Sequence, residues 1–168
     1  TIHRARPGVL VALDEEGGDV TRLEAATGSS VPGNAALGAA DDLDLTRGVA
    51  AALGGALRAA GTDLDLAPCA DANTDPANPV IGVRSFGADP EVVARHTVSF
   101  VAGLQAAGVA ACVKHFPGHG AVDVDSHLDL PTVRAPLELL RARELVPFRA
   151  AVGAGSAAVM TGHLRVPA

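Results

Sequence analysis

The stretch Val109-Ala-Ala-Cys-Val-Lys-His-Phe-Pro-Gly-His-Gly120 begins as a short apolar run and passes directly into a polar loop shaped by Gly and Pro. Similar short runs, bounded by glycine or polar residues, occur at residues 8–13, 64–67 and 157–161. Short apolar runs with few interruptions are typical of strands that are buried on both faces of a sheet. The sequence therefore predicts four strands of one buried sheet.

Helical patterns fill the spaces between these predicted strands. They cover about residues 45–60, 90–107 and 136–152. Asp44 or Thr46 is a candidate N-cap of the first helix, and Gly61 is its expected stop. The second helix is expected to begin after the N-cap Asp89, with Pro90 at its first position. Alternation of strands and helices predicts an α/β fold with a parallel sheet.

Long connections rich in Gly and Pro follow three of the predicted strands, at residues 14–43, 68–88 and 115–135. Loops of this length inside a compact domain are usually functional, and parallel sheets carry their sites after the C-terminal ends of the strands. Four strand–helix units are half of a (β/α)8 TIM-type barrel, so we expect an incomplete barrel. An open, doubly wound four-stranded sheet is the alternative. Residues 1–168 show no linker and are expected to form part of a single domain.

Composition narrows the classes of function. Of the 168 residues, 48% are apolar, which is enough for a core. The formal net charge of -6 argues against a nucleic-acid partner, because phosphate contacts need clustered Lys and Arg, and the aromatic content of 2% argues against stacking platforms. We expect no membrane span, and no signal peptide is visible within these residues, which favours the cytoplasm but leaves the compartment open. Cys69 and Cys112 lie in apolar stretches and are expected to be reduced core thiols.

Charged residues gather where the predicted strands end. Asp14 leaves the first strand, where a carboxylate needs a partner or a ligand. Arg84, in the second loop, is expected either to reach a substrate oxygen or to pair with Asp14. Lys114 and His115 come directly off the third strand, so at least one of them should point into the mouth of the sheet.

The third loop also carries a His and an Asp in a useful spacing. Asp125 and His127 are two residues apart, so in extended backbone they lie on the same side. A carboxylate beside an imidazole fixes its tautomer and favours its protonated form, which suits a general acid that then becomes a general base. A metal-dependent hydrolase using the loop 115–127 is an alternative, although no strong ligand signature is present. Its candidate ligands are His115, His119, Asp123 and His127.

Five motifs together carry a resemblance to a known family. Lys114-His-Phe-Pro-Gly-His-Gly120, followed by Asp125-Ser-His127, resembles the signature of glycoside hydrolase family 3 in its bacterial β-N-acetylglucosaminidase branch. Asp14-Glu-Glu-Gly-Gly18, Asp63-Leu-Asp-Leu-Ala-Pro68 and Arg84-Ser-Phe-Gly87 fall in the order of that family's other blocks. The resemblance covers essentially the whole chain. It implies that the chain is part of the family's N-terminal catalytic (β/α)8 barrel, roughly strands 2–5.

The resemblance also implies an activity. It implies a retaining glycoside hydrolase that removes terminal β-linked N-acetylglucosamine, or a related β-hexosaminide, in two steps. His127 would be the acid/base, oriented by Asp125. Neither a cofactor nor a metal is expected. The partners would be a small carbohydrate, such as a β-N-acetylglucosaminide or a muropeptide fragment, and the rest of the barrel. The residues that would hold the sugar through charged hydrogen bonds are Asp14, Arg22, Arg84, Lys114 and His115.

The nucleophile implied by the resemblance is an Asp in a Ser-Asp-Asp-like block on a later strand. Ala168 precedes such a block, so the isolated 168-residue chain is expected to be inactive. A non-catalytic barrel remnant that only binds sugar is therefore a further alternative. Phosphorolysis in place of hydrolysis also stays open, because a His acid/base does not repel phosphate.

Overall fold

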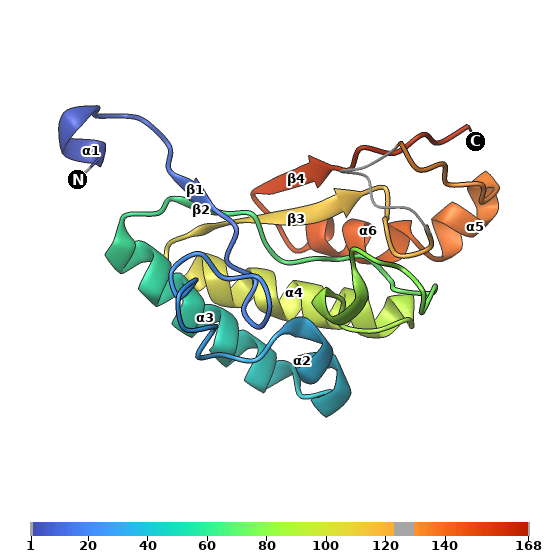
Figure 1. The fold of residues 1–168 in the computed structure, drawn as a ribbon, viewed down its shortest axis with the longest axis horizontal. Helices are drawn as coiled ribbons and strands as arrows, with labels where there is room; N and C mark the ends of the chain where they lie inside the picture. The colour runs from blue at the N-terminus through green and yellow to red at the C-terminus, as the bar shows by residue number, and fades with distance from the viewer. Residues whose placement is uncertain (1, 123–129, 168) are drawn as a thin grey trace.

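The computed structural model describes residues 2–122 and 130–167 (Figure 1). Its four-stranded parallel sheet has the order β1-β2-β3-β4. The strands are β1 (Ala12–Leu13), β2 (Leu64–Asp65), β3 (Ala110–Phe116) and β4 (Ala158–Thr161). Spatial order follows chain order, whereas a doubly wound sheet reverses direction at a switch point. The strand order therefore favours the barrel expectation over the doubly wound alternative.

The helices that the sequence predicts over about residues 45–60 and 90–107 are present. Three further helical segments, at residues 2–5, 34–40 and 82–84, are not among the predicted ones. In chain order, the helical segments are α1 (Ile2–Ala5), α2 (Asn34–Ala40), α3 (Leu43–Ala60), the 3₁₀ turn η1 (Gly82–Arg84), α4 (Pro90–Ala106), α5 (Leu137–Ala142) and α6 (Leu145–Gly153). Figure 1 shows α3, α4 and α6 on the same side of the sheet, as in the outer layer of a barrel. Among the residues that the structure describes, none of the helices is long and apolar enough to cross a membrane.

Helix starts depend on capping carboxylates. Asp89 caps α4 as expected, since its side chain accepts a hydrogen bond from the backbone N–H of Glu91 at 2.9 Å. The candidate caps Asp44 and Thr46 of α3 are wrong, because Asp42 accepts from the N–H groups of Asp44 and Leu45, each at 3.0 Å. A capping side chain must precede the amides that it satisfies, and only Asp42 does so.

The predicted helix over residues 136–152 is two helices, α5 and α6, which break at Arg143. Pro147 gives the physical reason, since a proline inside a helix lacks an N–H and its ring clashes with the carbonyl four residues earlier, here that of Arg143. The break places Pro147 in the first turn of α6, where a proline is tolerated.

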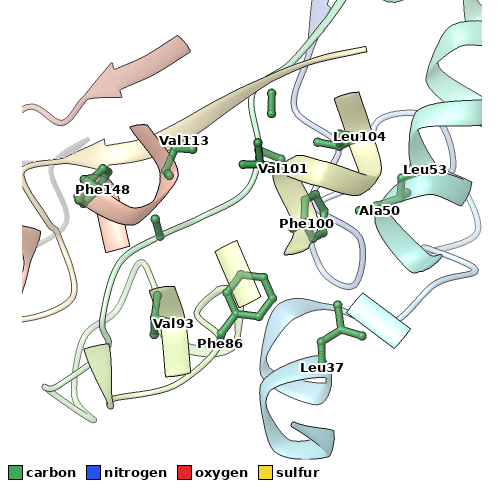
Figure 2. Packing of buried hydrophobic residues seen from close by; sticks show 14 of the residues in the cluster. Leu37, Ala50, Leu53, Phe86, Val93, Phe100, Val101, Leu104, Val113 and Phe148 are labelled. Atoms are coloured by element: carbon green, nitrogen blue, oxygen red, sulfur yellow. The ribbon is translucent and has the colours of Figure 1, made fainter. Parts of the chain in front are cut away.

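The core lies between the sheet and the helices. One buried cluster joins Phe100 and Leu104 of α4 to Leu53 of α3, Val113 of β3 and Phe148 of α6 (Figure 2). Both cysteines are free and buried, which confirms that they are core thiols.

Burial on both faces holds for the inner strand β3 but not for the outer strands. Residues 111–114 of β3 are all buried. The prediction is wrong for β1 and β4, where half-buried positions alternate with exposed ones and Val159 is 40% exposed. An outer strand of the described sheet has a neighbour on one side alone, so less of its surface is covered.

Asp65 ends β2 and is fully buried. Its Oδ1 accepts a hydrogen bond from the backbone N–H of Glu15 at 3.0 Å. Burial raises the pKa of Asp65 to about 8 from an ordinary value of 3.8. The carboxyl is therefore substantially protonated at neutral pH.

Close contact between α3 and α4 gives a test of the packing. A Cβ on Gly103 of α4 would lie 2.4 Å from the backbone oxygen of Arg47 in α3. We expect Gly103→Ala to lower the free energy of unfolding of the intact protein by about 1–3 kcal/mol, because the two backbones must separate. In the matched control Gly48→Ala, where a Cβ meets nothing within 4 Å, we expect a gain of about 0.5–1 kcal/mol. Denaturant midpoints measure both, and a gain in Gly103→Ala would contradict the packing.

Asp65 gives a test in pH. Its folded-state pKa of about 8 lies above the unfolded value of 3.8, so the folded protein retains a proton that the unfolded chain releases as pH rises between these values. This carboxyl therefore makes folding less favourable as pH rises toward 8. Asp65→Asn cannot ionise, so its stability relative to wild type should increase steadily from pH 5 to pH 8. Urea unfolding at several pH values measures this difference, and a constant difference would refute the assignment.

Candidate active site

The loops that follow the strands enclose a cavity of about 330 Å³ at the C-terminal end of the sheet. All five side chains that the sequence predicts to bind sugar line it: Asp14, Arg22, Arg84, Lys114 and His115. The other lining residues are Val20, Val80, His119, Met160, Thr161, Gly162 and His163. Of this second group, sequence reasoning named His119 alone, as a candidate metal ligand. Most of the group comes from the end of β4 and the turn after it.

Lys114 is the buried centre of the cavity. Its Nζ lies 2.6 Å from Oδ1 of Asp14 and 2.7 Å from Oε1 of Glu16, and its side chain is 2% exposed. Burial alone would lower the pKa of Lys114, but the carboxylates of Glu16 and Asp14 outweigh burial and raise that pKa above its ordinary value. The ammonium group therefore stays charged although it is out of water.

Arg84 forms a two-pronged ion pair with Glu16. Its Nε and Nη2 donate to Oε2 and Oε1 of Glu16 at 3.0 and 2.7 Å. Burial alone would raise the pKa of Glu16, but the hydrogen bond from Arg84 and the charge of Lys114 lower it below its ordinary value. The expected pairing of Arg84 with Asp14 is wrong, because Lys114 occupies Asp14 and Glu16 faces the guanidinium.

Glu15 holds the main chain of the first loop at one edge of the cavity. Its side chain is buried and its Oε2 accepts the backbone N–H groups of Arg22 and Leu23 at 2.7 and 2.9 Å. These bonds fix the main chain of the first loop, while the side chain of Arg22 stays exposed. Asp14 and Glu16 therefore share Lys114, whereas Glu15 between them holds the main chain.

The imidazole of His115 is held by the buried carboxylate of Asp71. Its Nδ1 lies 2.8 Å from Oδ2 of Asp71, a residue with no exposed surface. The thiol of Cys69 donates to the same oxygen at 3.1 Å. Sequence reasoning missed the role of Asp71, which lies 44 positions before His115, with η1 and α4 between them.

Cys69, Asp71 and His115 offer three ligand atoms within 4.8 Å of one another, which raises the question of a metal site. Around a tetrahedral zinc ion, ligand atoms lie about 3.3–3.6 Å apart, as follows from metal–ligand distances of about 2.0–2.3 Å. Here the nitrogen and the sulfur approach the carboxylate oxygen to 2.8 and 3.1 Å, which are hydrogen-bond lengths. The geometry of this group is that of a hydrogen-bonded network.

Several candidate residues lie outside the described part of the chain. They are the predicted acid/base pair, Asp125 and His127, and the candidate metal ligand Asp123. The other two candidate ligands, His115 and His119, are in edge contact, with ring centroids 6.1 Å apart.

Comparison with known proteins places this geometry in a family. Residues 3–168 match the family model described as the glycosyl hydrolase family 3 N terminal domain. Beta-hexosaminidase A of Pseudoalteromonas piscicida is 39% identical over 165 residues, which are 95% of this chain and 27% of that protein. The beta-hexosaminidase of Xylella fastidiosa (strain 9a5c) is 42% identical over 164 residues, or 95% of this chain and 48% of that protein.

Solved structures of the same family resemble this chain closely. A glycoside hydrolase family 3 beta-N-acetylglucosaminidase from Paenibacillus sp. str. FPU-7 has a TM-score of 0.91 and 52% identity, covering 95% of this chain and 30% of that one. NagZ from Neisseria gonorrhoeae, crystallised in complex with N-trifluoroacetyl-D-glucosamine, has a TM-score of 0.84 and 40% identity, covering 96% and 49%.

These matches confirm the TIM-type barrel fold that the motifs predict. The chain spans about half or less of the length of the relatives it matches. It nevertheless matches the family model over nearly its whole length, and we conclude that this chain belongs to glycosyl hydrolase family 3 and carries residues of that family's N-terminal domain.

Proposed function

We propose that the complete protein containing this chain is a retaining glycoside hydrolase that removes terminal β-linked N-acetylglucosamine. The observation that carries the proposal is the network of Asp14, Lys114, Glu16 and Arg84 around one cavity at the C-terminal end of a parallel sheet. Relatives named beta-hexosaminidase and beta-N-acetylglucosaminidase support the same activity. We also propose that residues 1–168 form part of a single catalytic barrel domain.

The charged network suits a sugar without any aromatic platform. Asp14 is 37% exposed in its side chain, so it can accept hydrogen bonds from hydroxyl groups while Lys114 holds it in place. Lys114 and Arg84 supply donors whose orientation is fixed by Glu16. Charge-assisted hydrogen bonds are roughly twice as strong as neutral ones. The cavity of about 330 Å³ lies at the lower end of the usual range for small-molecule pockets, which suits a single terminal sugar.

The proposed chemistry has two steps. A carboxylate supplied by a later strand of the complete barrel attacks the anomeric carbon, while His127 donates its proton to the departing oxygen. A water molecule then attacks the anomeric carbon of the glycosyl–enzyme. His127 takes a proton from this water as the enzyme carboxylate leaves. Asp125 would orient His127 and stabilise its protonated form. The assignment of these two residues rests on the Asp-Ser-His motif.

Arg22 and His115 complete the proposed sugar site. Arg22 lines the cavity with an exposed side chain on the loop that Glu15 fixes, and His115 lies beside Lys114. We propose muropeptide fragments that end in β-linked N-acetylglucosamine as natural substrates, since the polar cavity would recognise the terminal sugar.

The acid role of His127 can be tested in the complete enzyme. His127→Ala should lower kcat/KM by at least about 100-fold on a β-N-acetylglucosaminide with a poor leaving group, because the departing oxygen then lacks its proton donor. The loss should be much smaller on an activated aryl glycoside. His3→Ala, on α1, serves as the control and should change neither rate. Equal losses on both substrates would remove His127 from the acid role.

The binding role of Asp14 gives a separate test. Asp14→Asn keeps the size of the side chain but removes the charge that faces Lys114 and the sugar. We expect kcat/KM on an aryl β-N-acetylglucosaminide to fall about 10–150-fold, the usual effect of losing a hydrogen bond to a charged group. Asp19→Asn, an exposed acid of the same loop that lies outside this cavity, is the matched control and should retain activity. Equal activities in the two variants would refute the assignment of Asp14.

A further inference from the structure

Asp71 is a buried carboxylate that accepts hydrogen bonds from several donors. Its Oδ1 accepts the backbone N–H of His119 at 2.6 Å, and its Oδ2 accepts from Nδ1 of His115 at 2.8 Å and from the thiol of Cys69 at 3.1 Å. The backbone N–H of His115 also lies 3.2 and 3.3 Å from the two oxygens. Asp71 therefore contacts both ends of the turn over residues 115–119.

The charge state of Asp71 decides what His115 can do. Burial alone would raise the pKa of Asp71, but the hydrogen bond and charge of His115, together with the N–H of His119, lower that pKa below its ordinary value. Asp71 is thus an ionised carboxylate, which can only accept hydrogen bonds. Because it faces Nδ1 of His115, that nitrogen must carry a proton.

A fixed Nδ1–H tautomer leaves Nε2 of His115 for the cavity. The side chain of His115 is 18% exposed and lines the cavity beside Lys114. When this imidazole is neutral, the proton on Nδ1 leaves a lone pair on Nε2, which can accept a hydrogen bond from a sugar hydroxyl. Lys114 and Arg84 can only donate, so this acceptor complements them.

The main chain adds a second constraint on the same turn. The N–H of Gly118 donates to the carbonyl of His115 at 2.8 Å, which closes the turn that Asp71 holds at both ends. A Cβ on Gly120 would lie 1.9 Å from the carbonyl oxygen of Ala72, the residue after Asp71. The segment that carries Asp71 and the loop that carries His115 are therefore in direct backbone contact.

We propose that Asp71 is a positioning residue for the hydrolase: it acts through His115, fixes the Nδ1–H tautomer and presents Nε2 as an acceptor to the sugar. This inference rests on the proposed function for its effect on catalysis. Its structural part, the tautomer of His115, stands independently of the reaction.

Asp71→Asn in the complete enzyme tests the proposal. The amide has the size of the carboxylate, but its NH₂ group donates, so Nδ1 of His115 must accept and the proton moves to Nε2. In ¹⁵N NMR spectra of the histidine side chains, recorded at alkaline pH, we expect Nδ1–H in the wild type and Nε2–H in Asp71→Asn. The signal of His115 is assigned by its loss in His115→Ala. We also expect kcat/KM to fall about 10–150-fold.

A double variant separates positioning from general damage to the fold. If Asp71 acts through His115, Asp71→Asn combined with His115→Ala should lose no more activity than His115→Ala alone, within about two-fold. Multiplied losses would overturn the proposal. Asp75→Asn is the matched control, because this acid lies in the same connection and accepts the N–H of Ala77 at 2.8 Å. It should leave both the tautomer and the activity unchanged.

The activity assay and the NMR spectrum test different parts of the proposal. If the complete enzyme hydrolyses no β-N-acetylhexosaminide, the proposed function fails, while the wild-type NMR spectrum still reports the tautomer of His115. An Nε2–H tautomer in the wild type overturns the role of Asp71 whatever the activity. If Asp71→Asn does not fold, the wild-type spectrum alone decides between these outcomes.

Discussion

The buried ammonium group of Lys114 is the constraint on which the site depends. Removing a lone charge from water is very unfavourable, and Lys114 is retained because Asp14 and Glu16 lie within 2.7 Å of it. Asp14 and Glu16 follow β1, Lys114 lies within β3, and Arg84 joins the network from the connection after β2. The charges therefore tie three segments of the chain, distant in sequence, to one point at the end of the sheet.

This arrangement explains how a protein with 2% aromatic residues can have a well-formed cavity for a polar ligand. Lys114 and Arg84 are already oriented by Glu16 before a ligand arrives, so little side-chain freedom remains to be lost on binding. Behind them, Asp71 gives His115 a similarly fixed orientation. Burial keeps these interactions strong, because they are only weakly screened by solvent and salt.

Much of the scaffold could be predicted from local chemistry. Asp89 and Pro90 indicate the start of α4. The parallel sheet brings Asp14, Arg84 and Lys114 together, because loops after parallel strands meet at one edge. Which of three consecutive acids faces Arg84 depends on how the main chain turns after β1, and no local pattern reveals that Glu16 does so.

The role of Asp71 likewise depends on contacts between residues distant in sequence. The break between α5 and α6, in contrast, could have been predicted from Pro147. The roles of Asp125 and His127 stay predictions from their motif.

The sequential strand order has an evolutionary consequence: each strand-to-helix connection contributes its own contacts to a common rim, while the packed layer of α3 and α4 lies elsewhere. Ligand selectivity can thus diverge by exchange of one connection at a time, with the scaffold inherited unchanged.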